Sequence, residues 1–196
     1  MGFSNSVGDE EGRRSEVLCR LSPAERSHPK GRLYPLPRID DTLEMLSESK
    51  LFSTLDLASG YWQVELTEEA REKTAFCTTE GLYEFKVMPF GLCNAPATFQ
   101  RLMDVVLSGL QWTSCMVYLD DIIVMGRTFA EHVYNLEEVF RRIREAGLKI
   151  KPDKCFFLKD KVKYLGHIVS KEGIEADPEK TSKVKYWRLP TTVKEV

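Results

Sequence analysis

Apolar and polar positions recur along the chain with two periodicities, one typical of helices and the other of strands. Apolar residues three and four positions apart predict helices from residue 42 to near 50, over 95–110 and 129–146, and from residue 178 towards 187. Short apolar or alternating runs predict strands over 52–57, 61–66, 115–118, 122–125, 148–151, 155–158 and 162–169, and a hairpin over 74–87 that turns at Glu80 and Gly81. Helices between hairpins, without a regular strand–helix–strand repeat, favour an α+β fold in which an antiparallel sheet packs on helices.

Capping residues mark where these helices are expected to begin. They are Asp41 with Glu44, Asn94 with Pro96, and Thr128 with Glu131. The helix after Thr128 is expected to end at Gly147. Its predicted inward face consists of Val133, Leu136, Phe140 and Ile143.

Charge divides the chain into two parts, although the formal net charge is only −2. Residues 141–196 carry 15 Lys and Arg against 8 Asp and Glu, a net of +7, and residues 1–140 carry 13 against 22, a net of −9. This balance excludes a uniformly basic nucleic-acid binder, but it leaves a basic C-terminal part that can contact phosphate. With 42% hydrophobic residues the 196-residue chain can bury the core of one domain, which excludes wholesale disorder.

Five cysteines are scattered along the chain without a CxxC pair. They are Cys19, Cys77, Cys93, Cys115 and Cys155. An odd number without paired spacing fits neither a disulfide framework nor a zinc ribbon, so we expect a reducing compartment, the cytosol or the nucleus. We expect no signal peptide and no membrane partner, because no apolar run approaches the ~20 residues of a membrane span.

Three aspartates occupy positions where strands disfavour carboxylates. Asp120 and Asp121 adjoin one another between two apolar runs, and Asp56 lies between Leu55 and Leu57, on the opposite strand face from both. A tight turn explains the first two, and an edge or a satisfied core carboxylate explains the third. On neighbouring strands the three would instead form a pocket of oxygen ligands suited to Mg²⁺. The three histidines are scattered, and no Ser/His/Asp set supports nucleophilic hydrolysis.

Ordered sequence blocks carry a family resemblance from about Leu33 to the C-terminus. They are residues 34–41 (YPLPRIDD), 55–64 (LDLASGYWQV), 87–100 (VMPFGLCNAPATFQ), 118–121 (YLDD), and 164–167 (YLGH) followed by 177–180 (DPEK). The YLDD block resembles the YxDD box of reverse transcriptases, and the whole set is similar to the reverse transcriptases of gypsy-type LTR retrotransposons. A YxDD box alone is a weak signal, whereas these blocks in this order are very specific.

The resemblance implies a polymerase palm, a ferredoxin-like fold with an antiparallel sheet on helices. The implied activity is that of an RNA-directed DNA polymerase, which transfers nucleotides to a primer 3′ end under the direction of a template. By the resemblance, Asp56, Asp120 and Asp121 are catalytic and bind two Mg²⁺ ions, with Mn²⁺ as a substitute, and Asp56 and Asp120 bridge both ions. The implied partners are an RNA or DNA template with its primer, and dNTPs.

Further residues match the family's nucleotide-binding positions. Tyr61 matches the aromatic steric gate, whose ring leaves room for hydrogen but not for hydroxyl at C2′ of the incoming nucleotide. Phe90 and Gly91 match the region that holds nucleotide and template, beside a helix N-terminus that can bind phosphate. Tyr118 and Leu119 match positions beside the primer terminus. From the residues alone, Tyr61 is typical of a sheet aromatic, and Phe90 equally fits a core position.

The primer-side residues follow in the basic part of the chain. Leu165, Gly166 and His167 match the primer grip, where glycine lets the backbone approach primer phosphates; a β-turn glycine is the alternative. Lysines precede this turn at positions Lys149, Lys151, Lys154, Lys159, Lys161 and Lys163. We expect a subset, with Lys151 and Lys154 foremost, to bind primer or template through phosphates, although a solvated surface explains any one of them.

The sequence also departs from the family. Residues 1–32 lack the basic and aromatic fingers pattern, and we expect them to be disordered or unrelated to the fold. We assign residues 33–170 to the palm and residues 171–196 to the start of the thumb or connection region. With incomplete fingers the triphosphate lacks a clamp, so we expect impaired catalysis by this chain alone. The alternatives are an inactive retroelement remnant that binds nucleic acid or a protein partner, and a mere gene fragment. We expect self-association through exposed Trp62, Phe76, Phe85 and Phe90.

Overall fold

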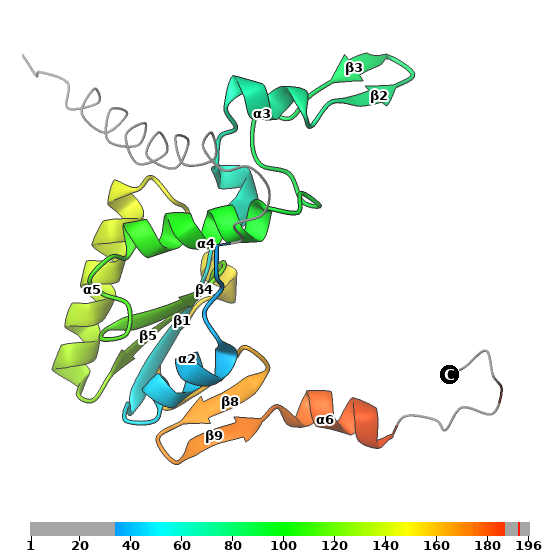
Figure 1. Cartoon of the computed structure of the whole chain (residues 1–196). Coiled ribbons are helices and arrows are strands. Elements are labelled where there is room, and N and C mark those ends of the chain that lie inside the picture. Colours follow the sequence, from blue (N-terminus) through cyan, green and yellow to red (C-terminus); the bar gives the residue numbers. More distant parts are fainter. Residues whose placement is uncertain (1–33, 187–191, 193–196) are drawn as a thin grey trace, which may run out of the picture.

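The computed structural model describes residues 34–186 and residue 192, with the elements labelled in Figure 1. Its helices are α2 (Ile39–Leu46), α3 (Glu68–Glu72), α4 (Ala95–Val106), α5 (Phe129–Glu145) and α6 (Pro178–Lys185), with the 3₁₀ turns η1 (Gly60–Gln63) and η2 (Pro152–Lys154). Its strands are β1 (Leu51–Asp56), β2 (Phe76–Thr78), β3 (Gly81–Tyr83), β4 (Cys115–Tyr118), β5 (Asp121–Gly126), β6 (Phe156–Lys159), β7 (Lys161–Tyr164), β8 (His167–Ser170) and β9 (Gly173–Ala176). The fold is therefore mixed α+β, as the sequence predicts.

A four-stranded antiparallel sheet with the order β4–β5–β1–β6 forms the centre of the molecule. β1 and β5 pair along their whole length, from Leu51 opposite Gly126 to Asp56 opposite Asp121. β4 and β5 form a hairpin that closes where Tyr118 pairs with Asp121. The apolar runs predicted as strands therefore lie side by side in one sheet, and Asp56 and Asp121 lie at the same end of its two central strands.

Side chains that alternate across this sheet build two separate cores. On one face, Leu55 and Ile122 join a core that includes residues of α4 and α5. On the other face, Phe52 and Ile123 join a core that includes residues of α2 and of the sheet β7–β8–β9. The central sheet is therefore sandwiched, with α4 and α5 on one side and α2 and the smaller sheet on the other.

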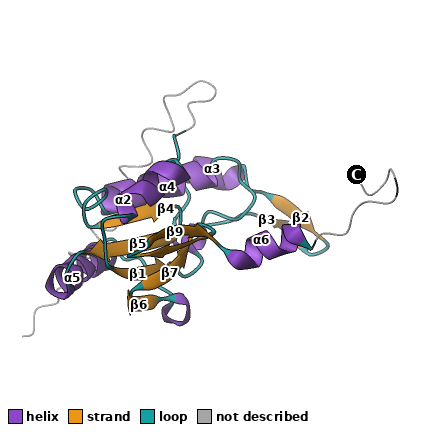
Figure 2. Cartoon of the chain, turned by 90° about the horizontal axis from the view of Figure 1, so that it is seen from below, coloured by secondary structure: helices purple, strands orange, loops and turns teal. Residues whose placement is uncertain are grey.

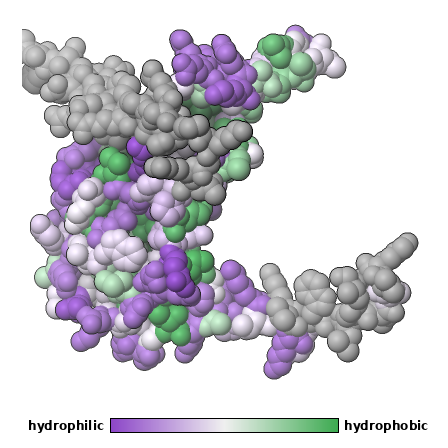
Figure 3. All heavy atoms as spheres, in the orientation of Figure 1, coloured by the Kyte–Doolittle hydropathy of each residue, from purple (hydrophilic) through white to green (hydrophobic). Residues whose placement is uncertain are grey.

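Two arms extend from this body to the same side of the molecule, as the views in Figures 1 and 2 agree. One arm is α3 with the hairpin β2–β3, and the other is α6, which follows β9. Figure 3 shows the hairpin arm standing out from the body and carrying apolar surface. The aromatic side chains expected to be exposed are so: Trp62 by 54%, Phe76 by 42%, Phe85 by 36% and Phe90 by 63%.

Helix α5 follows its predicted capping signals. The Glu131 N–H donates to Oγ1 of Thr128, and Gly147 ends the helix with a left-handed φ of 69°. Its fully buried face differs in part from the predicted one. It consists of His132, Asn135, Val139 and Ile143, and the other predicted inward residues are only half-buried.

The other helix boundaries differ from prediction. The predicted cap at Asp41 is wrong, because α2 begins at Ile39 and the Thr42 N–H donates to the Arg38 carbonyl inside the helix. Asn94 does occupy the N-cap position of α4, although its side chain makes no capping hydrogen bond. α4 ends at Val106, before the predicted residue 110, because the chain turns there into a loop that leads to β4.

Three predicted strands are wrong or divided. Residues 61–66 begin in the 3₁₀ turn η1, because left-handed Ser59 (φ 52°) curls the chain, and Glu65 forms only an isolated bridge to Val87. Residues 148–151 contribute a single bridge, from Ile150 to Leu57. The predicted strand 162–169 is split into β7 and β8 by a turn at Leu165 and Gly166, and β9 was not predicted.

Two further expectations concern membrane spans and the cysteines. Among the described residues, no helix is long and apolar enough to cross a membrane. Cys77, Cys93, Cys115 and Cys155 are free thiols, whereas Cys19 and the predicted N-terminal segment 1–32 lie outside the described residues.

Candidate active site

The three predicted aspartates lie at one end of the central strands. Asp56 ends β1, Asp121 begins β5, and the two are register partners across the antiparallel pair. Asp120 lies in the turn between β4 and β5. Alternation turns Asp56 away from Leu55, as predicted from the sequence, towards the face covered by the β7–β8–β9 sheet.

The carboxylates affect one another's ionisation. Desolvation raises the pKa of Asp121, and the nearby carboxylates of Asp120 and Asp56 raise it further, whereas the ammonium of Lys154 acts in the opposite direction. Like charges disfavour the ionised form, and any cation that enters the site relieves this repulsion. The electrostatics of this end of the sheet therefore favour a bound cation.

Lys154 supplies the nearest positive charge. It belongs to the turn η2, and its Nζ lies 3.0 Å from Oδ2 of Asp56. The backbone of η2 is tied to the same strand end, because the Lys151 N–H donates to the Asp56 carbonyl at 2.9 Å. Lys154, predicted from the sequence to contact primer or template, therefore contacts a predicted catalytic carboxylate.

The turn that carries Asp120 has a strained backbone. Leu119 adopts a left-handed conformation with φ 57°, which costs an L-residue with a branched side chain about 1–2 kcal/mol. Its N–H donates to Oε1 of Gln100 in α4 at 2.7 Å. Tyr118 precedes it as the last residue of β4, where it pairs with Asp121. Both residues predicted to lie beside the primer terminus are therefore adjacent to the aspartates in space as well as in sequence.

Tyr61 lies beside the turn formed by Leu119 and Asp120, here called the aspartate turn, within a group of aromatic rings. Its ring centroid is 5.4 Å from that of Phe90 and 5.4 Å from that of Phe99, the latter in an edge-to-face arrangement. Desolvation and then the charge of Asp120 raise the pKa of the Tyr61 hydroxyl. Tyr61 and Phe90, predicted separately as nucleotide-binding residues, are thus in contact, and Phe90 is largely exposed rather than a core residue. Gly91 follows it in the exposed loop with φ 91°.

Gly60 explains how this aromatic group approaches the turn. A Cβ at this position would lie 2.8 Å from Cζ of Phe99 and 3.3 Å from Cβ of Asp120. Only glycine leaves both neighbours where they are, because contacts under 3 Å force atoms to move. The glycine of the LDLASGYWQV block is therefore needed for close packing between η1, α4 and the aspartate turn.

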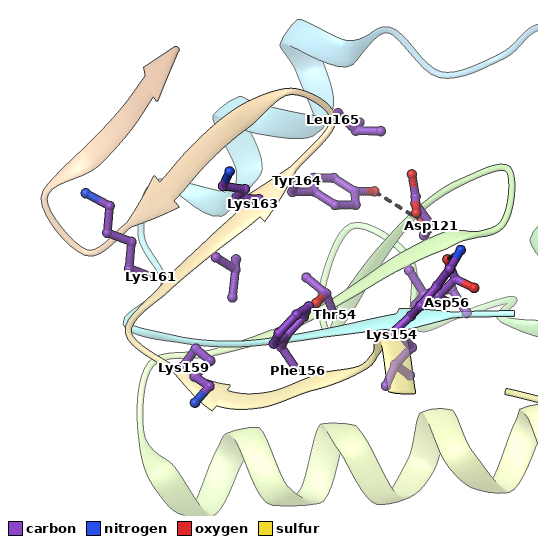
Figure 4. A pocket seen from close by; sticks show the side chains of 13 residues that line it. Thr54, Asp56, Asp121, Lys154, Phe156, Lys159, Lys161, Lys163, Tyr164 and Leu165 are labelled. Atoms are coloured by element: carbon purple, nitrogen blue, oxygen red, sulfur yellow. Dashed lines mark hydrogen bonds and ion pairs between the residues drawn. The ribbon is translucent and has the colours of Figure 1, made fainter. Parts of the chain in front are cut away.

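The predicted primer grip faces the acidic end across a cavity. Leu165 and Gly166 form the β7–β8 turn with φ of 48° and 80°, and Nδ1 of His167 lies 3.1 Å from the Leu165 carbonyl oxygen. The Tyr164 hydroxyl donates to the Asp121 carbonyl at 3.4 Å (Figure 4).

That cavity has a volume of about 390 Å³. Figure 4 shows its lining, which combines the carboxylates of Asp56 and Asp121 with Leu165 and basic side chains. The sequence therefore brings the acidic and primer-side motifs to one hollow, from elements more than 40 residues apart in the chain.

The basic side chains around the cavity are unequally paired. Lys161 lies 3.7 Å from Glu175, and Lys163 lies 3.4 Å from Asp177 and 2.7 Å from Glu179. Lys159 also lines the cavity and forms no ion pair within the described part of the chain, so its charge is available to another partner. Lys149 and Lys151 lie outside the cavity lining and likewise form no ion pair with the described residues.

The donor set suits a hard divalent cation, although the carboxylates are not gathered into a preformed cage. Among residues 34–186 and 192, no three His, Cys, Asp or Glu side chains are arranged as ready ligands of a metal ion. Carboxylate oxygens are nevertheless the donors that Mg²⁺ prefers, and it uses one or two of them together with substrate phosphates and water. Asp56, Asp120 and Asp121 therefore suit Mg²⁺, because they offer carboxylate oxygens and because a cation would relieve the repulsion between them. Lys154 forms an ion pair with Asp56 at the same place.

The polar groups behind the site were not predicted from the sequence. Gln100 and Asp104 in α4, and His132 with Ser53, are buried or half-buried side chains joined by hydrogen bonds. A glutamine on the inward face of α4, in line with Phe99 and Met103, was a usable signal, because an unpaired amide is costly to bury.

Known proteins are similar to this chain over the region that contains the site residues. A family model described as reverse transcriptase (RNA-dependent DNA polymerase) matches residues 16–169, which begins ahead of the sequence blocks described above. The retrovirus-related Pol polyprotein from transposon 297 of Drosophila melanogaster is 45% identical over 83% of this chain, and that from transposon gypsy is 42% identical over 83%. This chain covers only 15% and 16% of those polyproteins.

Solved structures agree with the sequence relatives. The foamy viral protease–reverse transcriptase in complex with an RNA/DNA hybrid is similar over 89% of this chain, with a TM-score of 0.73 and 27% identity, and 23% of that chain is covered. A second foamy viral structure, in complex with double-stranded DNA, gives a TM-score of 0.74 over 89% of this chain and 30% of its own. With a family match over more than half of its length, the chain belongs to the reverse transcriptase family.

Proposed function

We propose that this chain is the palm region of a retrotransposon reverse transcriptase, and that it transfers nucleotides to a primer 3′ end under the direction of a template. One observation carries the proposal. Asp56 and Asp121 are paired in register at the end of two central strands, and both line a cavity. Asp120 lies in the adjoining turn. Strands disfavour carboxylates, and a group whose pKa is raised by burial and by neighbouring like charges marks a candidate functional site.

The proposed cofactor is a pair of Mg²⁺ ions held by Asp56, Asp120 and Asp121, and Mn²⁺ would replace them. When bound, two such ions lower the pKa of an attacking hydroxyl and stabilise the leaving pyrophosphate. The protein's own contribution is to hold the carboxylates at one end of the central strands. The Tyr61 ring, packed against Phe90 and Phe99, is the group we propose to test the sugar of the incoming nucleotide.

Nucleic-acid binding is proposed on the primer side of the cavity. Similar foamy viral structures hold an RNA/DNA hybrid and double-stranded DNA. In this chain Lys159 and Leu165 line the cavity, and the ammonium group of Lys159 forms no ion pair with the described residues. Contacts from lysine to phosphate are independent of sequence, as a polymerase that copies any template requires.

We further propose that this chain alone works slowly. It covers 15% of the polyprotein from transposon 297, and positioning of reactants supplies roughly 7–11 kcal/mol of barrier reduction in favourable cases. In addition, the ammonium group of Lys154 forms an ion pair with Asp56, and an incoming cation has to displace that ammonium group.

Single-turnover primer extension tests the proposed function. Purified chain in molar excess over a labelled primer–template receives one dNTP and Mg²⁺, and the matched variant Asp120→Asn serves as the control. Incorporation by the wild type that Asp120→Asn abolishes supports the proposal. No incorporation, together with salt-sensitive binding of primer–template, would support the alternative of a nucleic-acid-binding module without catalysis.

The exposed aromatic side chains support a second, independent proposal about assembly. Trp62, Phe76, Phe85 and Phe90 expose apolar surface on and near the hairpin arm, and Phe76 is 5.2 Å from Phe85 between ring centroids. We propose that isolated chains self-associate through this surface. Size-exclusion chromatography at rising concentration would show oligomers in the wild type and fewer in Phe76→Ser, whereas a monodisperse monomer at high concentration contradicts the proposal.

A further inference from the structure

Gln100 is a fully buried amide whose hydrogen-bonding groups are all used. It lies in the middle of α4 with no exposed surface. Its Oε1 accepts from the Leu119 N–H at 2.7 Å, and its Nε2 donates to Oδ1 of Asp104 at 2.8 Å and to the Val117 carbonyl at 3.3 Å. These partners fix the orientation of the amide, because the Leu119 N–H can only donate and the Asp104 carboxylate can only accept.

Asp104 extends this pair to the surface of the domain. Its Oδ1 also accepts from Nε2 of Gln111 at 2.8 Å, and its Oδ2 accepts from the Tyr34 hydroxyl. Burial and the hydrogen bond to Asp104 raise the pKa of Tyr34 to about 12, so this hydroxyl stays protonated and keeps donating at neutral pH. The carboxylate is therefore held by three donors, and it holds the Gln100 amide in turn.

The point at which this network ends is the strained residue of the aspartate turn. Leu119 has φ 57°, a conformation that an L-residue keeps only when its surroundings impose it. Gln100 imposes it from two sides, because it bonds the N–H of Leu119 and the carbonyl of Val117, two residues earlier in β4. The direction in which the next residue, Asp120, leaves the turn follows from this backbone conformation.

We propose that Gln100 and Asp104 are positioning residues, which fix the backbone of Leu119 so that Asp120 presents its carboxylate to the divalent cation. This inference rests on the proposed function, since it concerns the cation that the aspartates are proposed to hold. Gln100 contacts no substrate or cation itself and acts through the turn. Outer groups of this kind orient metal ligands, and their loss costs about 10–100-fold in metal affinity.

Binding of Mn²⁺ alone to the full chain, measured by electron paramagnetic resonance, tests the inference. Gln100→Met keeps the volume of the side chain and removes its hydrogen bonds, so we expect a loss of Mn²⁺ affinity of about 10-fold or more. Asp104→Asn keeps an acceptor oxygen for Gln100 and should retain affinity within about threefold, whereas Asp104→Leu should lose it. Amide exchange at Leu119 should be faster in Gln100→Met than in the wild type.

A matched control separates positioning from mere loss of stability. Val106→Ala removes buried apolar volume from the same helix without touching the network, and it should lower the melting temperature while leaving the Mn²⁺ affinity unchanged. If Gln100→Met does not fold, the partly exposed Asp104→Asn and Asp104→Leu pair provides the same comparison.

The outcomes distinguish the inference from the function on which it rests. Mn²⁺ affinity that is equal in wild type, Gln100→Met and Asp104→Leu overturns the positioning role and leaves the metal site intact. Wild-type affinity no greater than that of Asp121→Asn overturns the proposed metal site itself, and the positioning role with it. Affinity lost in Gln100→Met and Asp104→Leu but kept in Asp104→Asn and Val106→Ala supports both.

Discussion

Asp56 and Asp121 face one another as register partners across β1 and β5, and the only ammonium in ion-pair contact with either among the described residues belongs to Lys154. Two carboxylates and one cation leave the pair short of positive charge. The site is therefore built at a cost in stability that a bound cation relieves.

Asp121→Asn should stabilise the metal-free chain at neutral pH. The pKa of Asp121 is raised in the folded state, so its contribution to stability is present at low pH and is lost as the pH rises through that raised value. We expect the variant to melt roughly 2 °C higher at pH 7, a gain held below about 1 kcal/mol by solvent screening, and to melt like the wild type near pH 4. Thermal unfolding with a chelator at both pH values measures this. A variant less stable than the wild type at pH 7 would contradict it.

Lys154→Met should bind divalent cations more tightly than the wild type. Its ammonium lies 3.0 Å from Asp56, where it competes with an incoming ion. We expect the Mn²⁺ dissociation constant to fall about fivefold, which corresponds to about 1 kcal/mol. Lys159→Met is the matched control, because Lys159 lines the same cavity without an ion pair to the described residues. Equal affinity in the two variants would show that Lys154 does not compete.

Gly60→Ala should destabilise the junction between the aromatic group and the aspartate turn. The added Cβ would lie 2.8 Å from Cζ of Phe99, so one of the two must move, at a cost of about 1–3 kcal/mol in unfolding free energy. In a Phe99→Leu background the added methyl has room, and Gly60→Ala should cost less than half as much. Denaturant unfolding of the four proteins in this cycle measures the coupling, and a cost that is the same in both backgrounds argues against steric contact.

His132 should make stability depend on pH below its ordinary pKa of 6.5. It is fully buried on α5, where its Nε2 lies 2.8 Å from Oγ of Ser53, which also accepts from the Leu158 N–H. Burial lowers the pKa of His132 below its ordinary 6.5, so its contribution to stability is full above that value and is lost as the pH falls towards the folded-state pKa.

The unfolding free energy should therefore fall with decreasing pH, by up to about 1.4 kcal/mol per unit from this group. His132→Gln keeps a polar side chain that does not titrate, and it should flatten the dependence. An unchanged slope in this variant would assign the pH dependence to other groups.

Much of the fold was predictable because its strands are simple apolar runs. The hairpin of β4 with β5 fits two apolar runs joined by a tight turn, and the opposite orientations of Asp56 and Leu55 follow from alternation. The strand predicted over 61–66 failed because a 3₁₀ turn and a β-strand accept the same aromatic and apolar residues, and left-handed Ser59 decides between them.

The site was less predictable than the fold. Sequence blocks indicated the aspartates and Tyr61, but the contact of Lys154 with Asp56 joins residues 98 positions apart and follows only from tertiary structure. Gln100 and His132 were missed for a related reason, because a polar residue on an apolar helix face has meaning only once its buried partners are known.

Iron-mediated cleavage of the backbone tests whether Asp56, Asp120 and Asp121 hold a divalent cation. Fe²⁺ replaces Mg²⁺ at the site, and ascorbate with hydrogen peroxide then generates radicals that cut the backbone nearby. We predict cuts near residues 56 and 120–121 that excess Mg²⁺ suppresses and that Asp120→Asn abolishes. Cleavage elsewhere in the chain, or cuts at these positions that persist in Asp120→Asn, would show that the three aspartates do not hold the cation.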